Sequence, residues 1–280
     1  MAGKSILIVD DDPAIHVLLR QLLNAEDWQV DSAIDGDEAL SRLLAGAYDL
    51  VLADIVMPGM DGLALLKRIR EVRPLVKVVI MTAVNTPAHV VQSIRNQAYS
   101  YLGKPFSREA VSETLHAALV DAVGEDDIVV HSAQPNWVSV ELRCKLSTAE
   151  RLTQFFRELS ADLKTEDREM ISTAFRELLM NAIEHGGRCD PGQKVNLTFV
   201  RGARCILYYI RDPGEGFSFE RLPHAAVSNS PERPLAHAEV RGALGIRPGG
   251  FGILLSWNFA DEVVYSERGN EVVLIKYLNP

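Results

Sequence analysis

Ile6-Leu-Ile-Val-Asp-Asp-Asp12 is a short apolar run that ends in three acidic residues. A continuous apolar run of this length is typical of a parallel strand that is buried on both faces. A helical pattern follows from Pro13 to about Ala25, with its leucines on one face. The same alternation recurs along the chain, with strands expected at 29–33, 50–53, 76–81 and 100–102 and helices at 37–44, 63–72, 87–96 and 108–120. These units predict a doubly wound α/β domain with five parallel strands.

The composition limits the classes of function. The 280 residues, 47% of them hydrophobic, are enough for about two domains with their own cores. The net charge of −9 argues against a nucleic-acid partner, because phosphate backbones select basic surfaces. Cys144, Cys189 and Cys205 lack metal-ligand spacing and are expected to be reduced thiols. With no signal-peptide pattern and no apolar run of the ~20 residues that span a bilayer, we expect a cytoplasmic protein without a membrane partner.

The alternation of strands and helices stops after Val120. Residues 122–136 are predicted to be a linker, which divides the chain into domains at 1–121 and 137–280. The second domain is expected to open with a strand at 137–145. Helices are then expected at 149–163 and 166–184, strands near 195–200 and 204–211, a helix from about 251, and strands near 262–266 and 271–277. This order predicts an α+β fold with helices on a mostly antiparallel sheet.

Polar side chains stand at four strand ends of the first domain, where ligand sites of open parallel sheets lie. They are Asp10-Asp11, Asp54, Thr82 and Lys104. Three crowded carboxylates repel one another, so a hard cation such as Mg²⁺ is expected between them. A carboxylate kept ionised by that metal and by Lys104 can attack phosphorus, while Thr82 can hydrogen-bond the phosphoryl oxygens. An acid after a strand more often caps the next helix, but capping does not account for four complementary strand ends.

The first domain resembles the response-regulator receiver family of CheY-like, flavodoxin-like fold over about residues 4–121. The motifs that carry the resemblance are Val9-Asp-Asp-Asp12, Asp54-Ile-Val-Met-Pro-Gly-Met-Asp-Gly62, Thr82-Ala83 and Lys104-Pro-Phe106. The resemblance implies that an upstream histidine kinase phosphorylates Asp54. It implies that Mg²⁺ is held by Asp10, Asp11, Asp54 and the backbone carbonyl of Val56.

The same resemblance assigns further roles around Asp54. It implies that Lys104 and Thr82 are catalytic, that Thr82 and Tyr101 are switch residues, and that the bond between Lys104 and Pro105 is cis. For Tyr101, a plain core role is an equal alternative.

The second domain carries three clusters that suit a nucleotide. Glu177 and Asn181 are four residues apart on a predicted helix and share a face, which His185 continues. Asn181 can bind a phosphate-bridging magnesium ion, and Glu177 can take a proton from an attacking hydroxyl. Asp212-Pro-Gly-Glu-Gly-Phe217 follows a strand, so its glycines permit close approach of a planar base and Asp212 can accept from the adenine amino group. Gly249-Gly-Phe-Gly252 opens a helix, where backbone amides favour phosphate.

These clusters resemble the GHKL (Bergerat-type) ATP-binding sandwich, and within it the anti-sigma-factor serine kinases of the RsbW and SpoIIAB type, over about residues 137–280. Glu177–His185 matches the N box, Arg211–Phe217 the first glycine box, and Gly250–Gly252 with Asn258–Glu262 the second. The resemblance implies that Glu177 is the general base and that Asn181 is the magnesium ligand. It implies that ATP is bound by Asn181, Asp212, Gly214, Gly216, Gly250 and Gly252.

Three features of this half keep more than one interpretation. The segment Glu220–Pro248 is longer than the family's ATP lid and can be a lid, a contact with the receiver or a partner surface. Arg241 and Arg247 can reach the γ-phosphate, although surface charges are more often neutral to function. His185 is either a hydrogen-bonded helix residue or a catalytic one.

The two resemblances together predict a response regulator in which Asp54 phosphorylation controls an ATP-dependent serine/threonine-protein kinase. By this likeness the kinase is a homodimer that phosphorylates a STAS-type anti-sigma-factor antagonist and binds a sigma factor or comparable target. An alternative is a module in which ATP only shapes a surface that sequesters such a partner. A hybrid histidine kinase needs a dimerising helical hairpin with a phosphorylatable histidine, and the span from Val120 to Trp137 is too short for one.

Overall fold

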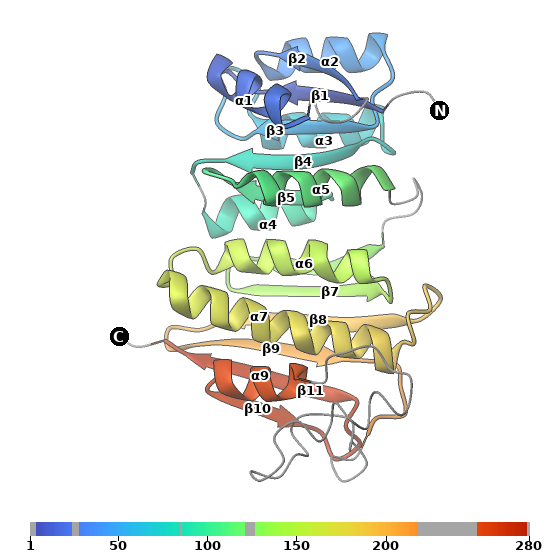
Figure 1. Cartoon of the computed structure of the whole chain (residues 1–280), viewed down its shortest axis with the longest axis vertical. Coiled ribbons are helices and arrows are strands. Elements are labelled where there is room, and N and C mark those ends of the chain that lie inside the picture. The colour runs from blue at the N-terminus through green and yellow to red at the C-terminus, as the bar shows by residue number, and fades with distance from the viewer. Residues whose placement is uncertain (1–3, 24–27, 85, 121–126, 218–250, 279–280) are drawn as a thin grey trace. The chain divides into compact units, whose positions relative to one another are not determined.

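The computed structural model describes residues 4–23, 28–84, 86–120, 127–217 and 251–278 (Figure 1). The chain divides into two compact units, one of residues 1–126 with 154–159 and one of residues 127–153 with 160–280. The residues in these ranges form two β-sheets, of five and six strands. None of the helices in the described ranges is both long enough and apolar enough to cross a bilayer.

The first sheet has five parallel strands in the order β2-β1-β3-β4-β5. The strands are β1 Ser5–Val9, β2 Gln29–Ala33, β3 Leu50–Asp54, β4 Lys77–Thr82 and β5 Ser100–Gly103. They alternate with α1 Pro13–Leu23, α2 Gly36–Ala45, α3 Gly62–Val72, α4 Pro87–Arg95 and α5 Arg108–Val120. The predicted doubly wound α/β fold is therefore confirmed. In this strand order the switch point, where ligands bind in such sheets, lies between β1 and β3.

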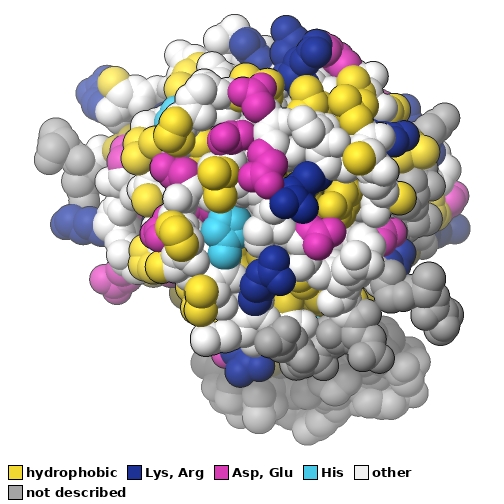
Figure 2. Space-filling model, turned by 90° about the horizontal axis from the view of Figure 1, so that it is seen from above, with side chains coloured by type: hydrophobic (Ala, Val, Ile, Leu, Met, Phe, Trp, Pro, Cys, Tyr) yellow, Lys and Arg dark blue, Asp and Glu magenta, His cyan; other side chains and the backbone are white. Residues whose placement is uncertain are grey.

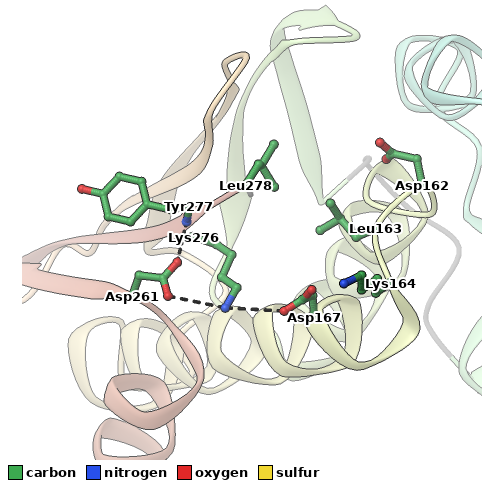
Figure 3. A pocket seen from close by; sticks show the side chains of 8 residues that line it. All are labelled: Asp162, Leu163, Lys164, Asp167, Asp261, Lys276, Tyr277 and Leu278. Carbon is green, nitrogen blue, oxygen red and sulfur yellow. Dashed lines mark hydrogen bonds and ion pairs between the residues drawn. The ribbon is translucent and has the colours of Figure 1, made fainter. Parts of the chain in front are cut away.

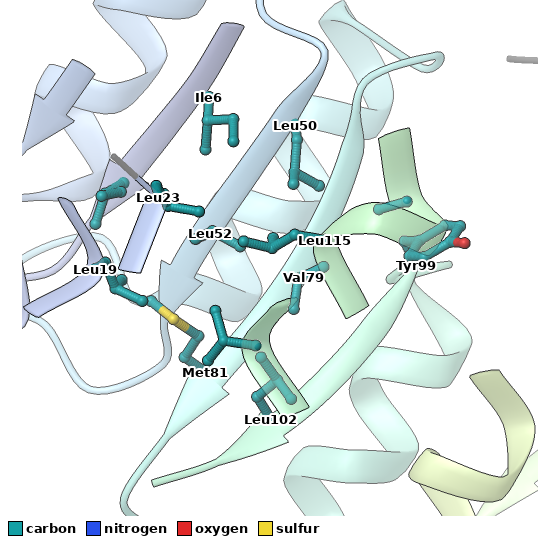
Figure 4. Packing of buried hydrophobic residues seen from close by; sticks show 13 residues of the cluster. Ile6, Leu19, Leu23, Leu50, Leu52, Val79, Met81, Tyr99, Leu102 and Leu115 are labelled. Carbon is teal, nitrogen blue, oxygen red and sulfur yellow. The ribbon is translucent and has the colours of Figure 1, made fainter. Parts of the chain in front are cut away.

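Both faces of the first sheet are buried, which explains the continuous apolar runs in the sequence. Figure 4 shows one face, where alternate strand residues pack against Leu19 and Leu23 of α1 and Leu115 of α5. The residues in between, such as Leu7, Val51 and Ile80, are equally buried on the other face. A strand of this kind has no room for polar side chains along its length, so those side chains gather where the strands end.

The second sheet has six strands in the order β10-β11-β9-β8-β7-β6, and all neighbours are antiparallel. The strands are β6 Ile128–Gln134, β7 Trp137–Arg143, β8 Lys194–Arg201, β9 Cys205–Arg211, β10 Glu262–Tyr265 and β11 Glu271–Tyr277. The helices are α6 Leu146–Leu159, α7 Thr165–Asn181 with a π turn η1 Ala182–Gly186, and α9 Gly252–Phe259. The predicted α+β fold is confirmed. Alternate strand residues form its core, and Phe175 of α7 stacks on Tyr208 of β9 at 4.6 Å between ring centroids.

The prediction that residues 122–136 form a linker is wrong for the part that the structure describes. Residues 128–134 form β6, which pairs with β7 across a turn at Pro135-Asn136. The register shifts between Val130 and Ser132. A bulge of this kind inserts an extra residue and breaks the strict alternation by which a strand is recognised in a sequence.

Positive and negative side chains are mixed on the surface that Figure 2 shows. Lys and Arg are interspersed there with Asp, Glu and hydrophobic side chains. This face therefore has no large region of a single charge sign, although the net charge of the chain is −9.

Candidate functional site

The first candidate site is an acidic cluster at the switch point of the parallel sheet. Oxygen atoms of Asp10, Asp11 and Asp54 all lie within 4.8 Å of one another. Asp10 follows β1 and is 1% exposed, Asp54 ends β3 and is 7% exposed, and Asp11 is exposed. The structure thus brings together the three carboxylates that the sequence predicted.

Lys104 provides the compensating positive charge from the end of β5. Its Nζ lies 2.7 Å from Asp10 Oδ2 and 3.3 Å from Asp54 Oδ1. The peptide bond between Lys104 and Pro105 is cis, as predicted. Burial raises the pKa of Asp54, Lys104 opposes that rise, and the neighbouring Asp10 adds to it.

The donor set of this cluster fits a hard cation. Asp54 Oδ1 is buried, and its contact with Lys104 Nζ at 3.3 Å is too poorly aligned to satisfy it as a hydrogen bond. Asp35 and Asp61 cap the helices α2 and α3, so Asp54 is not used as a helix cap. Asp10 accepts the backbone N–H of Asp12 through Oδ1 at 3.0 Å, which leaves Oδ2 for Lys104. Carboxylate oxygens are the ligands that Mg²⁺ prefers, and the ion would offset the negative charge that Lys104 leaves uncompensated. Asp10, Asp11 and Asp54 are therefore the residues that would hold it.

The loop after Asp54 folds back tightly on the strand. A Cβ at Gly62 would lie 2.0 Å from the backbone oxygen of Asp54, so only glycine fits there. Val56, whose carbonyl was predicted to bind the metal, lies in this loop with its side chain exposed.

The two predicted switch residues are both buried. Thr82 is fully buried at the end of β4, and its Oγ1 accepts the backbone N–H of Val84 at 3.1 Å. Tyr101 is fully buried on β5, burial raises the pKa of its hydroxyl, and that hydroxyl has no hydrogen-bond partner among the described residues. Their switch roles stay predictions.

The second candidate site is centred on α7, which carries Glu177 and Asn181. Both side chains reach the start of α9, because a Cβ at Gly252 would lie 2.7 Å from Glu177 Oε2 and 3.3 Å from Asn181 Nδ2. Ser256 of α9 fixes this approach by donating from its hydroxyl to the carbonyl of Ala174 at 3.2 Å. Gly252 therefore leaves the space into which the two polar groups project.

Asp212 meets the C-terminal end of the same helix. The π turn η1 brings Gly186 so close that a Cβ there would lie 2.2 Å from Asp212 Oδ1. The backbone N–H of Gly214 donates to the same oxygen at 2.8 Å. Burial raises the pKa of Asp212, whereas the hydrogen bond from Gly214 and the charge of Arg268 oppose the rise. The structure thus places Asp212 beside the end of the helix that carries Glu177 and Asn181, and its contact with adenine stays a prediction.

The first glycine box is fixed by the turn between β10 and β11. Gly216 has a φ of 82°, and a Cβ there would lie 1.9 Å from the carbonyl of Arg268. Phe217 packs edge-on against Tyr265 at 5.2 Å between ring centroids. The backbone of Asp212 is bonded to Asn270, whose carbonyl accepts the Asp212 N–H at 3.0 Å.

Several predictions fall outside the described residues. These concern Gly250, Arg241, Arg247 and the segment Glu220–Pro248. His185 is described and is exposed within the π turn. The π turn breaks the helical spacing that would have aligned His185 with Glu177 and Asn181.

A cavity of ≈ 530 Å³ lies at the other end of α7, around Lys276 (Figure 3). Lys276 Nζ lies 3.6 Å from Asp167 Oδ1 and 3.5 Å from Asp261 Oδ1. Asp162 is paired with Arg201 at 2.9 and 2.5 Å. The three acidic residues that line this cavity are therefore each paired with a basic side chain.

Comparison with known proteins assigns both domains. Residues 6–116 match the response regulator receiver domain. They are 35% identical over 115 residues to sporulation initiation phosphotransferase F of Bacillus subtilis, a match that covers 41% of this chain and 93% of that protein. The first domain belongs to the response regulator receiver family. Residues 142–276 match the histidine kinase-like ATPase domain, so the chain joins a receiver to an ATPase domain of that kind.

Further similar proteins match about two fifths of this chain. The transcriptional regulatory protein ResD of Bacillus subtilis is 41% identical over 107 residues, which cover 38% of this chain and 44% of ResD. The response regulator TrrA of Thermotoga maritima, solved with Mg²⁺ and BeF, is 36% identical with a TM-score of 0.38, over 41% of this chain and 99% of TrrA. The chain therefore spans less than half of the length of ResD.

Three residues next to the second candidate site have no signature in the sequence. Gly186 packs on Asp212, and Arg176 with Glu150 contacts Glu177. Gly186 follows the N box directly but has no motif of its own. Arg176 precedes Glu177, and adjacent residues of a helix are not expected to face each other.

We expect Asp54→Asn to raise the midpoint of thermal unfolding at neutral pH when Mg²⁺ is chelated. Because the folded-state pKa of Asp54 is raised, the ionised carboxylate costs stability above that pKa, and the amide removes this cost. The advantage should shrink as the pH falls towards the raised pKa, since wild-type Asp54 then becomes protonated. Calorimetric scans across pH measure the effect, with the exposed Asp11→Asn as control. A lower midpoint for Asp54→Asn at neutral pH would mean that attraction by Lys104 outweighs burial.

We expect Gly252→Ala to weaken binding of a non-hydrolysable ATP analogue about tenfold or more, a cost of about 1.4 kcal/mol. The added methyl group occupies the space that Glu177 Oε2 and Asn181 Nδ2 use. Isothermal calorimetry measures the affinity. Gly202→Ala is the matched control, because its Cβ would have no neighbour closer than 3.7 Å. Equal affinities for the two variants would contradict the placement of the nucleotide between α7 and α9.

Proposed function

We propose that this protein is a two-component response regulator whose phosphorylation at Asp54 controls an ATP-dependent protein serine/threonine kinase. The kinase domain acts on a STAS-type anti-sigma-factor antagonist, binds a sigma factor or comparable target, and functions as a homodimer. The observation that carries the proposal is the combination, in one chain, of the Asp10–Asp54–Lys104 cluster with a helix that presents Glu177 and Asn181 to the start of α9.

The receiver step is transfer of a phosphoryl group from a histidine of an upstream kinase. An oxygen of Asp54 forms the new bond to phosphorus, the P–N bond breaks, and the histidine nitrogen keeps the electron pair and gains a proton. Lys104 stabilises the added negative charge from its position between Asp10 and Asp54. Bound Mg²⁺ supplies further positive charge at the three carboxylates.

The kinase step is transfer of the γ-phosphate of ATP to a serine hydroxyl. The serine oxygen bonds to the γ-phosphorus, the bond to the β,γ-bridging oxygen breaks, and ADP leaves. Glu177 accepts the hydroxyl proton, Asn181 orients the magnesium–phosphate end, and Asp212 accepts from the adenine amino group. Two features of Asp212 support its role: its side chain is partly buried, and Gly186 and Gly214 lie beside its carboxylate.

The path of the chain between the two domains supports a serine kinase over a hybrid histidine kinase. α5 ends at Val120 and β6 starts at Ile128. The residues from 121 to 127 are too few for a dimerising hairpin of two helices. His131, the histidine nearest to this span, lies on the extended strand β6. An enzyme that phosphorylates a separate protein does not need such a hairpin.

The alternative is a nucleotide-gated module that sequesters an antagonist or sigma factor without phosphotransfer. Glu177→Gln separates the two functions, because it removes the base while Asn181 and Asp212 remain. We expect the variant to bind ATP but to lose transfer of labelled phosphate to STAS-domain proteins encoded with it, by about 10²–10⁴-fold. Lys194→Gln, which removes an exposed charge pair elsewhere in the domain, is the control. If Glu177→Gln regulates its target normally in cells, the binding module is correct.

We expect receiver phosphorylation to change the transfer rate, and Asp54→Asn to remove the response. Purified protein is treated with a small-molecule phosphodonor and Mg²⁺, and labelled transfer is compared before and after treatment. An identical change in the Asp54→Asn protein would show that the effect does not pass through Asp54.

A further inference from the structure

The carboxylate of Glu177 is contacted on two sides. Its Oε1 accepts a hydrogen bond from Nη1 of Arg176 at 3.4 Å, and its Oε2 faces Gly252. Adjacent residues of a helix normally point in different directions. The contact therefore requires the arginine side chain to turn back along α7 towards its neighbour.

Glu150 of α6 holds the arginine in that position. Arg176 Nε donates to Glu150 Oε2 at 3.0 Å, and its Nη2 donates to Glu150 Oε1. This two-bond arrangement uses one edge of the planar guanidinium and leaves Nη1 for Glu177. The hydrogen bond with Glu150 is also the main reason why the pKa of Arg176 is raised.

Stability alone does not account for this arrangement. The side chains of Arg176, Glu150 and Glu177 are 39%, 47% and 28% exposed, and exposed ion pairs contribute only about 0–1 kcal/mol. The two hydrogen bonds to Glu150 instead fix the plane of the guanidinium and so the direction of Nη1. A general base must reach the proton that it accepts within about 2.6–3.2 Å, so the orientation of its carboxylate affects the rate directly.

We infer that Glu150 and Arg176 are positioning residues that orient the Glu177 carboxylate for proton transfer. Neither residue touches the reacting atoms, since Arg176 acts on Glu177 and Glu150 acts on Arg176. The inference rests on the proposed kinase function, and it adds two residues, one of them from a different helix, to the machinery of that site.

The kinetic test is transfer of labelled phosphate by the full-length protein. We expect Arg176→Gln to lower kcat about 10- to 100-fold while the affinity for the ATP analogue stays within about twofold. Glu150→Gln should cause a smaller loss of the same kind. Adding Arg176→Gln to Glu177→Gln should cause no further loss, because the arginine acts through the glutamate. Unchanged kcat in Arg176→Gln, or an equal extra loss in the Glu177→Gln background, would overturn the inference.

A structural readout separates this inference from the proposed function. Crystal structures of the full-length wild type and of Arg176→Gln, both with the ATP analogue, would show the Glu177 side chain directly. We expect one defined rotamer in the wild type and a shifted or multiple rotamer in the variant. Lys194→Gln, which removes an exposed pair on β7 and β8, should leave Glu177 unchanged. A Glu177 rotamer that does not respond to Arg176→Gln refutes the positioning role even if no phosphotransfer is ever measured, whereas absent transfer in the wild type refutes only the kinase.

Discussion

Both candidate sites contain a carboxylate that burial makes costly to ionise. Burial is the main reason why the pKa values of Asp54 and Asp212 are raised. Each carboxylate is partly compensated, Asp54 by the Lys104 ammonium and Asp212 by a backbone N–H group of Gly214. Neither compensation is complete, so each carboxylate is stabilised further by a ligand that brings positive charge or hydrogen-bond donors. Partial burial of a carboxylate therefore prepares both sites for binding.

The two domains position these carboxylates in different ways. In the receiver, strands buried on both faces exclude polar side chains from their length, and the parallel arrangement gathers those side chains at one end. In the ATPase domain the strands are antiparallel, so the site is assembled where a helix, a loop and a second helix approach closely. Glycines make that approach possible, because a Cβ at Gly186 or Gly252 would clash with the polar groups themselves.

The sequence predicted what depends on local pattern. The predicted bounds of the receiver helices and strands agree with the observed bounds within two residues, and only the end of α1 borders positions that are not described. The agreement is close because burial on both faces of the sheet leaves continuous apolar runs in the sequence, separated by short helices. β6 was missed because its bulge between Val130 and Ser132 disturbs the period of two. The Glu150–Arg176 contact was missed for another reason: it joins residues 26 positions apart on different helices, and only the packing of α6 beside α7 brings them together.

The end of α7 illustrates how a departure from regular structure assembles the site. A continued α-helix would place His185 in line with Glu177 and Asn181, which is what the spacing predicted. The π turn widens the last turn by one residue, so His185 is exposed and Gly186 instead meets the Asp212 carboxylate. π turns are rare and occur frequently at functional sites, and this one creates the contact between Gly186 and the Asp212 carboxylate. It brings the loop that carries Asp212 against the end of the helix that carries Glu177, as the proposed nucleotide site requires.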